Sequence, residues 1–182
     1  LEKMGLNSGD TSEMSFEDVR LPVAKVLGGE GEGFANLMNE LPRERLILGV
    51  GCVGAADGIL EQTVSYVSER QAFGEPLSRL QNTRFELAEV KTDLELNRAL
   101  MEKCIDKYID GSLSTEEASM VKLASSEMQG KVVDRCLQLF GGYCYMKEYP
   151  IALAYVDARV QRIYGGTSEV MKELIARSLV GR

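Results

Sequence analysis

Residues 114–142 read STEEASMVKLASSEMQGKVVDRCLQLFGG, and this stretch contains the signals for both ends of one helix. Ser114 followed three residues later by Glu117 is the signature of a capping box at a helix start. The glycine pair 141–142 is typical of a helix end. Between them, apolar residues recur at the spacing of one helix face: Ala118, Val121, Met128, Val132, Cys136 and Leu139. The stretch therefore predicts a long amphipathic helix that must bury one face against other helices.

The same periodicity continues on both sides of this helix. One helix is expected from about residue 31 to the turn AFGEPL at 72–77, with the apolar stripe Leu46, Val50, Val53, Leu60, Val64 and Val67. Another is expected from about 78 to 110, with the stripe Leu87, Val90, Leu94, Met101, Ile105 and Tyr108. Shorter helices are expected at about 150–164 and 167–180. Such elements predict an all-α, up-and-down four-helix bundle with short C-terminal helices.

Residues 1–30 follow a different pattern. The segment SEMSFEDVRLPVAKVLGG, residues 12–29, alternates apolar and polar side chains around Met14, Phe16 and Val19. Alternation of this kind predicts one or two strands, too few to form a stable sheet alone. We interpret residues 1–30 as a short β remnant of a preceding middle domain and residues 31–182 as the helical bundle domain. Because the chain begins at Leu1, we expect it to be part of a longer protein.

Composition excludes several classes of function. A net charge of -7 argues against nucleic acid as the main partner, because phosphate binding needs a basic face. No apolar run approaches the ~20 residues of a membrane span. Histidine is absent, which excludes Ser-His and Cys-His nucleophiles and the Glu-x-x-His pairs of di-metal bundles. The four cysteines lack C-x-x-C spacing, so no metal site is expected.

Three turns are more elaborate than a bundle requires. They lie at 68–85, 138–150 and 157–170, and each combines a glycine with a helix end and a nearby charged or aromatic side chain. Glycine-rich turns at helix ends can bind phosphate through free backbone N–H groups. Each turn alone is more often an ordinary helix cap. Three such turns in one bundle suggest a large ligand that carries phosphate.

The motifs in these turns resemble a known family. R-Q-A-F-G-x-P-L-x-x-x-Q at 70–81, Q-L-F-G-G-Y-x-Y-M-x-E-Y-P at 138–150 and D-A-R-V-x-x-I-Y-x-G-T-S-E at 157–169 are similar to the C-terminal domain of the acyl-CoA dehydrogenases, especially the long-chain and general bacterial branch. The resemblance implies an FAD flavoprotein that dehydrogenates an acyl-CoA thioester between its α and β carbons. A carboxylate would remove the α-proton while a hydride leaves to flavin N5.

The resemblance also implies a position for that carboxylate. Medium- and short-chain members have a glutamate in the pattern Y-E-G-T, where this chain has Gly165. Long-chain and isovaleryl members instead take the base from the first long helix of the domain, at a position that matches Glu44. We therefore expect Glu44 to be the catalytic base and Gly165 to leave the volume that it needs. Taken alone, Glu44 would be interpreted as a solvated carboxylate paired with Arg43 or another cation.

The other site residues follow from the same resemblance. Substrate contacts are expected from Pro42, Arg43, Arg45, Gly165 and Gly166. FAD contacts are expected from Arg70, Phe73, Gln81, Gln138, Leu139, Phe140, Gly141, Gly142, Thr167, Ser168 and Glu169. Because the flavin of this family is shared between subunits, a homodimer or homotetramer is expected. Electron-transfer flavoprotein is the expected electron acceptor, in either a bacterial cytoplasm or a mitochondrial matrix. The alternative is a helical oligomerisation or binding module that kept the fold without catalysis.

Overall fold

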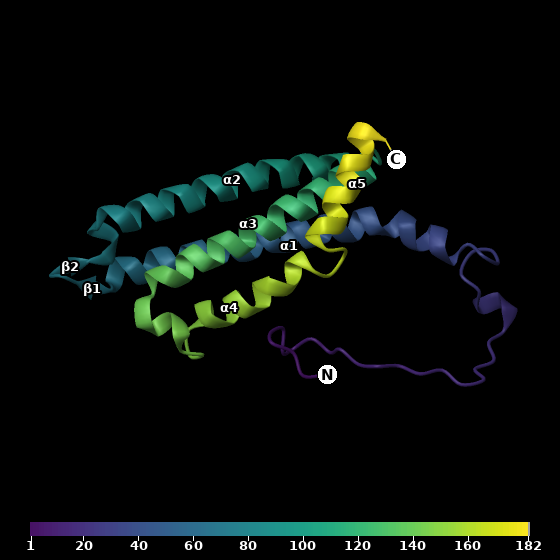
Figure 1. Cartoon of the computed structure of the whole chain (residues 1–182), viewed down its shortest axis with the longest axis horizontal. Helices are drawn as coiled ribbons and strands as arrows, with labels where there is room; N and C mark the ends of the chain where they lie inside the picture. Colours follow the sequence, from purple (N-terminus) through teal and green to yellow (C-terminus); the bar gives the residue numbers. More distant parts are fainter. Residues whose placement is uncertain (182) are drawn as a thin grey trace.

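The protein, described here by a computed structural model of residues 1–181, is a bundle of helices (Figure 1). Its five α-helices are α1 (Gly33–Glu69), α2 (Gln81–Ile109), α3 (Thr115–Leu139), α4 (Pro150–Ala158) and α5 (Ser168–Val180). The three long helices run alongside one another, α4 lies beside α3, and α5 crosses one end of the bundle. The predicted all-α, up-and-down bundle is confirmed.

Helix α3 lies at the centre of this arrangement, because it contacts α1, α2, α4 and α5. Its capping box forms as expected: the Glu117 backbone N–H donates to Ser114 Oγ at 3.1 Å, and the Ser114 N–H donates to Glu117 Oε2 at 3.3 Å. Five of its six predicted stripe residues are buried: Ala118, Val121, Met128, Val132 and Cys136. The stretch that predicted the bundle therefore forms its core.

Helix α1 buries only part of the predicted stripe: Leu46, Val53, Leu60 and Val67 are buried, and two residues are not. Val50 and Val64 of the expected stripe are 41% and 45% exposed. The buried face includes small and polar residues that an apolar stripe does not contain, among them Gly49 and Thr63. Val121 and Ser125 of α3 lie within 4 Å of the place where a Cβ on Gly49 would stand. Close approach between the two helices thus selects small residues, which a search for large apolar side chains misses.

A small hairpin closes the far end of α1. Strands β1 (Gln71–Ala72) and β2 (Glu75–Pro76) pair antiparallel, with Gln71 opposite Pro76. Phe73 and Gly74 form the two-residue turn, with φ of 56° and 87°. Two positive φ values define the type I′ turn that matches the twist of a hairpin. The turn presents Phe73 at the tip, where it is 91% exposed.

Residues 1–32 form no strand in the structure, so the expectation of strands around Met14 and Phe16 is wrong for the described chain. The segment is irregular, with a 3-10 turn at Val23–Lys25 and hydrogen-bonded turns at 6–9 and 29–32, and it runs outside the bundle (Figure 1). The reason is physical: a strand exists through its ladder partner, and none of the described residues supplies one. Near its start, the Leu6 N–H donates to the Asp157 carboxylate at 2.6 Å.

The length and composition of α1 deserve one comparison with a membrane span. An 18-residue window of this 37-residue helix reaches a mean hydropathy of 1.2, so α1 is long and apolar enough to cross a membrane, which the sequence analysis did not expect. The buried core helix of a bundle can have the same length and composition. Helix α1 packs against both α2 and α3, and its buried residues Leu46, Val53 and Leu60 belong to the main hydrophobic cluster.

Candidate functional site

The turn between α4 and α5 is built on two consecutive glycines. A 3-10 turn, Arg159–Arg162, extends α4, and the chain then enters Gly165 and Gly166 with φ of +65° and +104°. Left-handed values of this kind favour glycine. Thr167 follows as the N-cap of α5, and its hydroxyl accepts from the Val170 N–H at 3.3 Å. The turn therefore places a glycine pair at the start of a helix.

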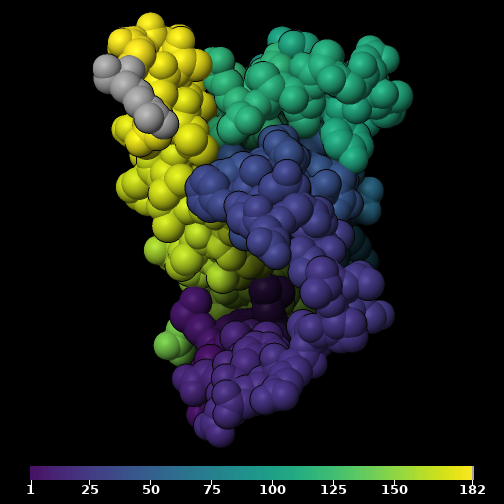
Figure 2. All heavy atoms as spheres, turned by 90° about the vertical axis from the view of Figure 1, so that its right-hand side faces the viewer, coloured from purple at the N-terminus to yellow at the C-terminus, as the bar shows by residue number. Residues whose placement is uncertain are grey.

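Helix α1 packs directly against this turn. Arg45, which is only 5% exposed, donates from Nε to the Gly165 carbonyl at 3.4 Å. The Leu48 side chain lies over Gly165, because a Cβ built there would stand 2.5 Å from Leu48 Cδ1. These contacts bring residues about 120 positions apart in sequence into one site. In the end-on view of Figure 2, α5 lies directly beside the first part of α1.

Glu44 lies on the same face of α1 as Leu48, one helical turn earlier. Its side chain is exposed, and within residues 1–181 it has no hydrogen bond or ion pair. Arg43, the cation expected to pair with a solvated Glu44, instead bonds Glu40 at 2.9 Å. The carboxylate of Glu44 is thus unpaired within the described residues, one turn before the leucine that lies over Gly165. Pro42 and Arg43 belong to the same part of α1, so the proposed substrate residues gather at one place.

Several backbone donors at this turn are free. Within the described residues, the N–H groups of Gly165, Gly166 and Thr167 have no hydrogen-bond acceptor in the protein. They lie at the N-terminus of α5, where the helix dipole favours negative charge. The Glu169 carboxyl shows this preference, because hydrogen bonds from its own backbone N–H and from Thr167 hold its pKa below the usual range. The turn can therefore stabilise negative charge on a bound group.

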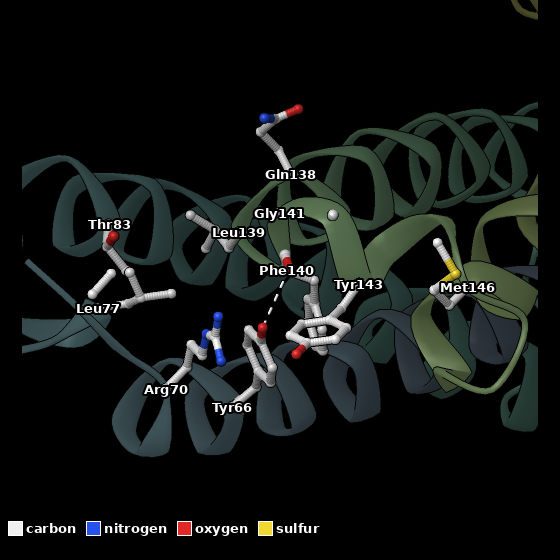
Figure 3. A pocket seen from close by; sticks show the side chains of 12 residues that line it. Tyr66, Arg70, Leu77, Thr83, Gln138, Leu139, Phe140, Gly141, Tyr143 and Met146 are labelled. Carbon is white, nitrogen blue, oxygen red and sulfur yellow. Dashed lines mark hydrogen bonds between the residues drawn. The ribbon is translucent and has the colours of Figure 1, made fainter.

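A second candidate site lies at the hairpin end of the bundle. It is a pocket of about 730 Å³ between the end of α1 and the end of α3 (Figure 3). The rings of Tyr66 and Phe140 stack with centroids 4.1 Å apart, and Tyr66 Oη donates to the Phe140 carbonyl at 3.3 Å. The Arg70 guanidinium lies 5.1 Å from the centre of the Tyr143 ring. Gly141, with φ of +58°, ends α3 at the pocket wall.

The predicted FAD residues divide between the two sites. Arg70 and the run Gln138–Gly142 line the pocket, although Gln138 extends away from the aromatic rings (Figure 3). Phe73 and Gln81 are exposed and do not line it, while Thr167–Glu169 lie at the glycine turn. The sequence reasoning missed six further lining residues: Tyr66, Ala72, Leu77, Thr83, Tyr143 and Met146. Among these, Tyr143 could have been predicted from the sequence, because it directly follows the glycine pair of the motif at 138–150.

The two sites are far apart within one chain. Arg70 lies 26 residues after Glu44 along α1. At a rise of 1.5 Å per residue, this places the two positions roughly 39 Å apart. Arg70 and Glu44 therefore cannot contact the same point of one ligand from within one chain.

The fold and the two candidate sites define the class of the chain as a helical-bundle domain with ligand sites at its two ends. A family model described as "Acyl-CoA dehydrogenase, C-terminal domain" matches residues 31–180. The chain therefore belongs to the acyl-CoA dehydrogenase family.

Individual relatives agree with this assignment. The mitochondrial long-chain specific acyl-CoA dehydrogenase of Rattus norvegicus is 49% identical over 180 residues, which cover 99% of this chain and 42% of that protein. The acryloyl-CoA reductase (NADH) of Anaerotignum propionicum is 41% identical, over 99% of this chain and 46% of that protein. A crystal structure of acyl-CoA dehydrogenase from Geobacillus kaustophilus superposes with a TM-score of 0.96 at 42% identity, over 99% of this chain and 47% of that one. The chain thus spans less than half the length of these relatives.

Proposed function

We propose that the protein to which this chain belongs is an FAD-dependent acyl-CoA dehydrogenase in which Glu44 removes the α-proton of the thioester. One observation carries the proposal: Leu48, one turn after Glu44 on the same face of α1, packs onto Gly165. The position that holds a base in other branches is thus a glycine, and an unpaired carboxylate lies on the helix that faces it. The space that Gly165 was expected to leave open is filled by Leu48, so a carboxylate supplied from α1 would approach the turn beside this leucine.

The chemistry explains why the turn matters as well as the base. The α-proton of a thioester is weakly acidic, so its removal needs a positioned base and hydrogen bonds to the carbonyl oxygen where enolate charge develops. Glu44 supplies the base. The free N–H groups at Gly165, Gly166 and Thr167 supply donors for the thioester carbonyl. Pro42, Arg43 and Arg45 border the bound substrate on the α1 side.

The residues of the hairpin-end pocket suit the FAD that the family implies. The planar guanidinium of Arg70 matches a pyrophosphate in a bidentate manner, and stacking against Tyr143 restricts its orientation. The aromatic faces of Tyr66 and Tyr143 suit a planar ring, while the backbone at Gly141–Gly142 is open to close approach. When bound, FAD supplies the acceptor for the substrate hydride. Thr167, Ser168 and Glu169 would lie beside its flavin end.

The separation of the two sites supports a shared cofactor. Arg70 and Glu44 are roughly 39 Å apart along α1, by the rise of an α-helix. Phe73 adds a second argument, because an aromatic side chain with positive φ at an exposed tip is strained and unburied in one chain. We infer that the hairpin contributes to the site of a neighbouring subunit. The assembly would then be a homodimer or homotetramer, with electron-transfer flavoprotein as its electron acceptor.

The test is Glu44→Gln in the full-length, FAD-loaded enzyme, because glutamine keeps the size of the side chain and removes its basicity. Loss of a general base lowers kcat about 10²–10⁴-fold. We expect a loss in that range, with acyl-CoA binding unchanged when measured by titration. Flavin reduction by a saturating acyl-CoA in a stopped-flow experiment reports the chemical step.

Glu40→Gln is the matched control, because Glu40 is also exposed and lies one turn earlier on α1, paired with Arg43. It should retain near-normal flavin reduction. The base assignment is wrong if Glu44→Gln reduces flavin as fast as this control does.

A further inference from the structure

Lys122 is an unusual residue in the core of the bundle. It lies in the middle of α3, is only 1% exposed, and leads the fully buried side chains by volume. Within residues 1–181 it forms no ion pair; its Nζ instead donates to the carbonyl of Gly166 at 2.7 Å. Lysine is almost never fully buried without a partner, because burial of an amine is unfavourable. Because burying this amine is unfavourable, its hydrogen bond to the Gly166 carbonyl points to a function for Lys122.

Arg45 of α1 forms the corresponding hydrogen bond to the preceding carbonyl, that of Gly165. It is buried in α1 and donates to the carbonyl of Gly165, so two buried cations hold two consecutive carbonyls. Burial lowers the pKa of both side chains. Ser168 adds a third tether, because its Oγ donates to Glu127 of α3 at 2.6 Å. Helices α1 and α3 thus hold the turn at three residues, Gly165, Gly166 and Ser168.

The geometry of the peptide bond turns this restraint into an orientation. In a trans peptide the C=O and N–H point in opposite directions, and the described chain contains no cis bond. When Arg45 and Lys122 hold the carbonyls of Gly165 and Gly166 from inside the bundle, the N–H groups of Gly166 and Thr167 face outward. The Glu44 side chain is likewise exposed to solvent. A glycine pair has the greatest backbone freedom, so this orientation needs external support.

We propose that Lys122 is a positioning residue of the acyl-CoA site: it fixes the glycine turn through the Gly166 carbonyl, so that the backbone N–H donors face the thioester oxygen. This inference rests on the proposed function for its catalytic consequence. Its structural part, the restraint of the turn, can be measured without any activity.

Lys122→Met in the full-length enzyme is the direct test, because methionine is unbranched, fills similar core volume and lacks the donor. Lys131→Met is the matched control, since Lys131 is exposed on the same helix, without a hydrogen bond in the described residues. Hydrogen–deuterium exchange of the bonded amides within 163–170, those of Ile163, Tyr164 and Val170, should become at least about tenfold faster in Lys122→Met only. Misplaced catalytic groups can lower rates about 100-fold, so we expect kcat to fall about 10- to 100-fold with KM nearly unchanged.

Each outcome decides the proposal. Slow exchange of these amides in a folded, FAD-loaded Lys122→Met protein overturns it, whatever the value of kcat. Fast exchange with normal kcat also overturns it, because the restraint would then be structural only. Failure of the base assignment is recognised separately, by normal flavin reduction in Glu44→Gln. If Lys122→Met does not fold, Lys122→Gln, whose donor is one bond shorter, should give the same two changes, and unchanged values again overturn the proposal.

Discussion

At the scale of single residues, Gly165 and Leu48 form a pair whose sizes depend on each other. Glycine fits the observed φ of +65° at position 165 without strain, and Leu48 occupies the space next to it. A side chain at position 165 therefore meets two obstacles, the backbone conformation and the leucine. Both must be relieved before a carboxylate at 165 can replace the one at Glu44.

This pair predicts the result of moving the carboxylate. In Glu44→Gly/Gly165→Glu, left-handed backbone costs roughly 1–2 kcal/mol for a non-glycine residue, and Leu48 Cδ1 must move. We expect partial activity relative to the inactive Glu44→Gly, and more activity when Leu48→Ala is added. Flavin reduction by acyl-CoAs of graded chain length measures both. Equal, background rates in all three FAD-loaded variants would show that positions 44 and 165 face different sites.

The residues of the site differ in how visible they are in the sequence. Glu44 and Gly165 were predicted because they match family motifs, and the structure places them on facing elements. Leu48 and Lys122 were not predicted, for opposite physical reasons. Leu48 is an ordinary apolar residue of an amphipathic helix, and a lysine in a helix is normally expected in solvent. Only the packing of α3 against the turn reveals where Lys122 points.

At the scale of elements, the capping box of α3 should contribute measurably to stability. Ser114→Ala removes the side chain that accepts from the Glu117 N–H, and loss of such a cap typically costs about 1 kcal/mol. Urea unfolding followed by circular dichroism should show a lower midpoint with an unchanged slope. Ser112→Ala is a suitable control, because Ser112 lies outside α3 in the preceding turn. Equal midpoints for the two variants would contradict the prediction.

The pH dependence of this cap follows from Glu117. Hydrogen bonds from Lys107 and Ser114 hold the pKa of the Glu117 carboxyl below its usual range. A lowered folded pKa contributes stability above the unfolded pKa of about 4.3, and the contribution is lost as pH falls through the folded pKa. The difference between wild type and Ser114→Ala should therefore be full at pH 7 and shrink below about pH 4.

Elements also show where sequence patterns reach their limit. The caps of α3 and α5 were predicted to within a residue, because a cap is a local hydrogen bond. The buried face of α1 was predicted only in part, because it depends on which residues of α3 come close. The strands expected around Met14 depended on a partner outside the described chain, and no local pattern can supply one.

At the scale of the whole molecule, the bundle contains its own core. The main cluster joins buried residues of α1, α2, α3 and α4, and none of its members comes from residues 1–32. We expect the isolated chain to give a strongly helical far-ultraviolet circular dichroism spectrum and one cooperative thermal transition. A chain starting at residue 31 should melt at nearly the same temperature. A largely disordered spectrum of the soluble chain would contradict the prediction that residues 31–182 form a self-sufficient domain.

The aromatic cluster at the hairpin end has an optical consequence. The chain contains no tryptophan and seven tyrosines. Two of these, Tyr66 and Tyr149, contact the Phe140 ring, and Tyr143 stacks on Tyr149. Chirally packed tyrosines dominate the near-ultraviolet signal of such a protein. The wall of the pocket therefore carries its own chromophores, and its state can be followed in solution without any label.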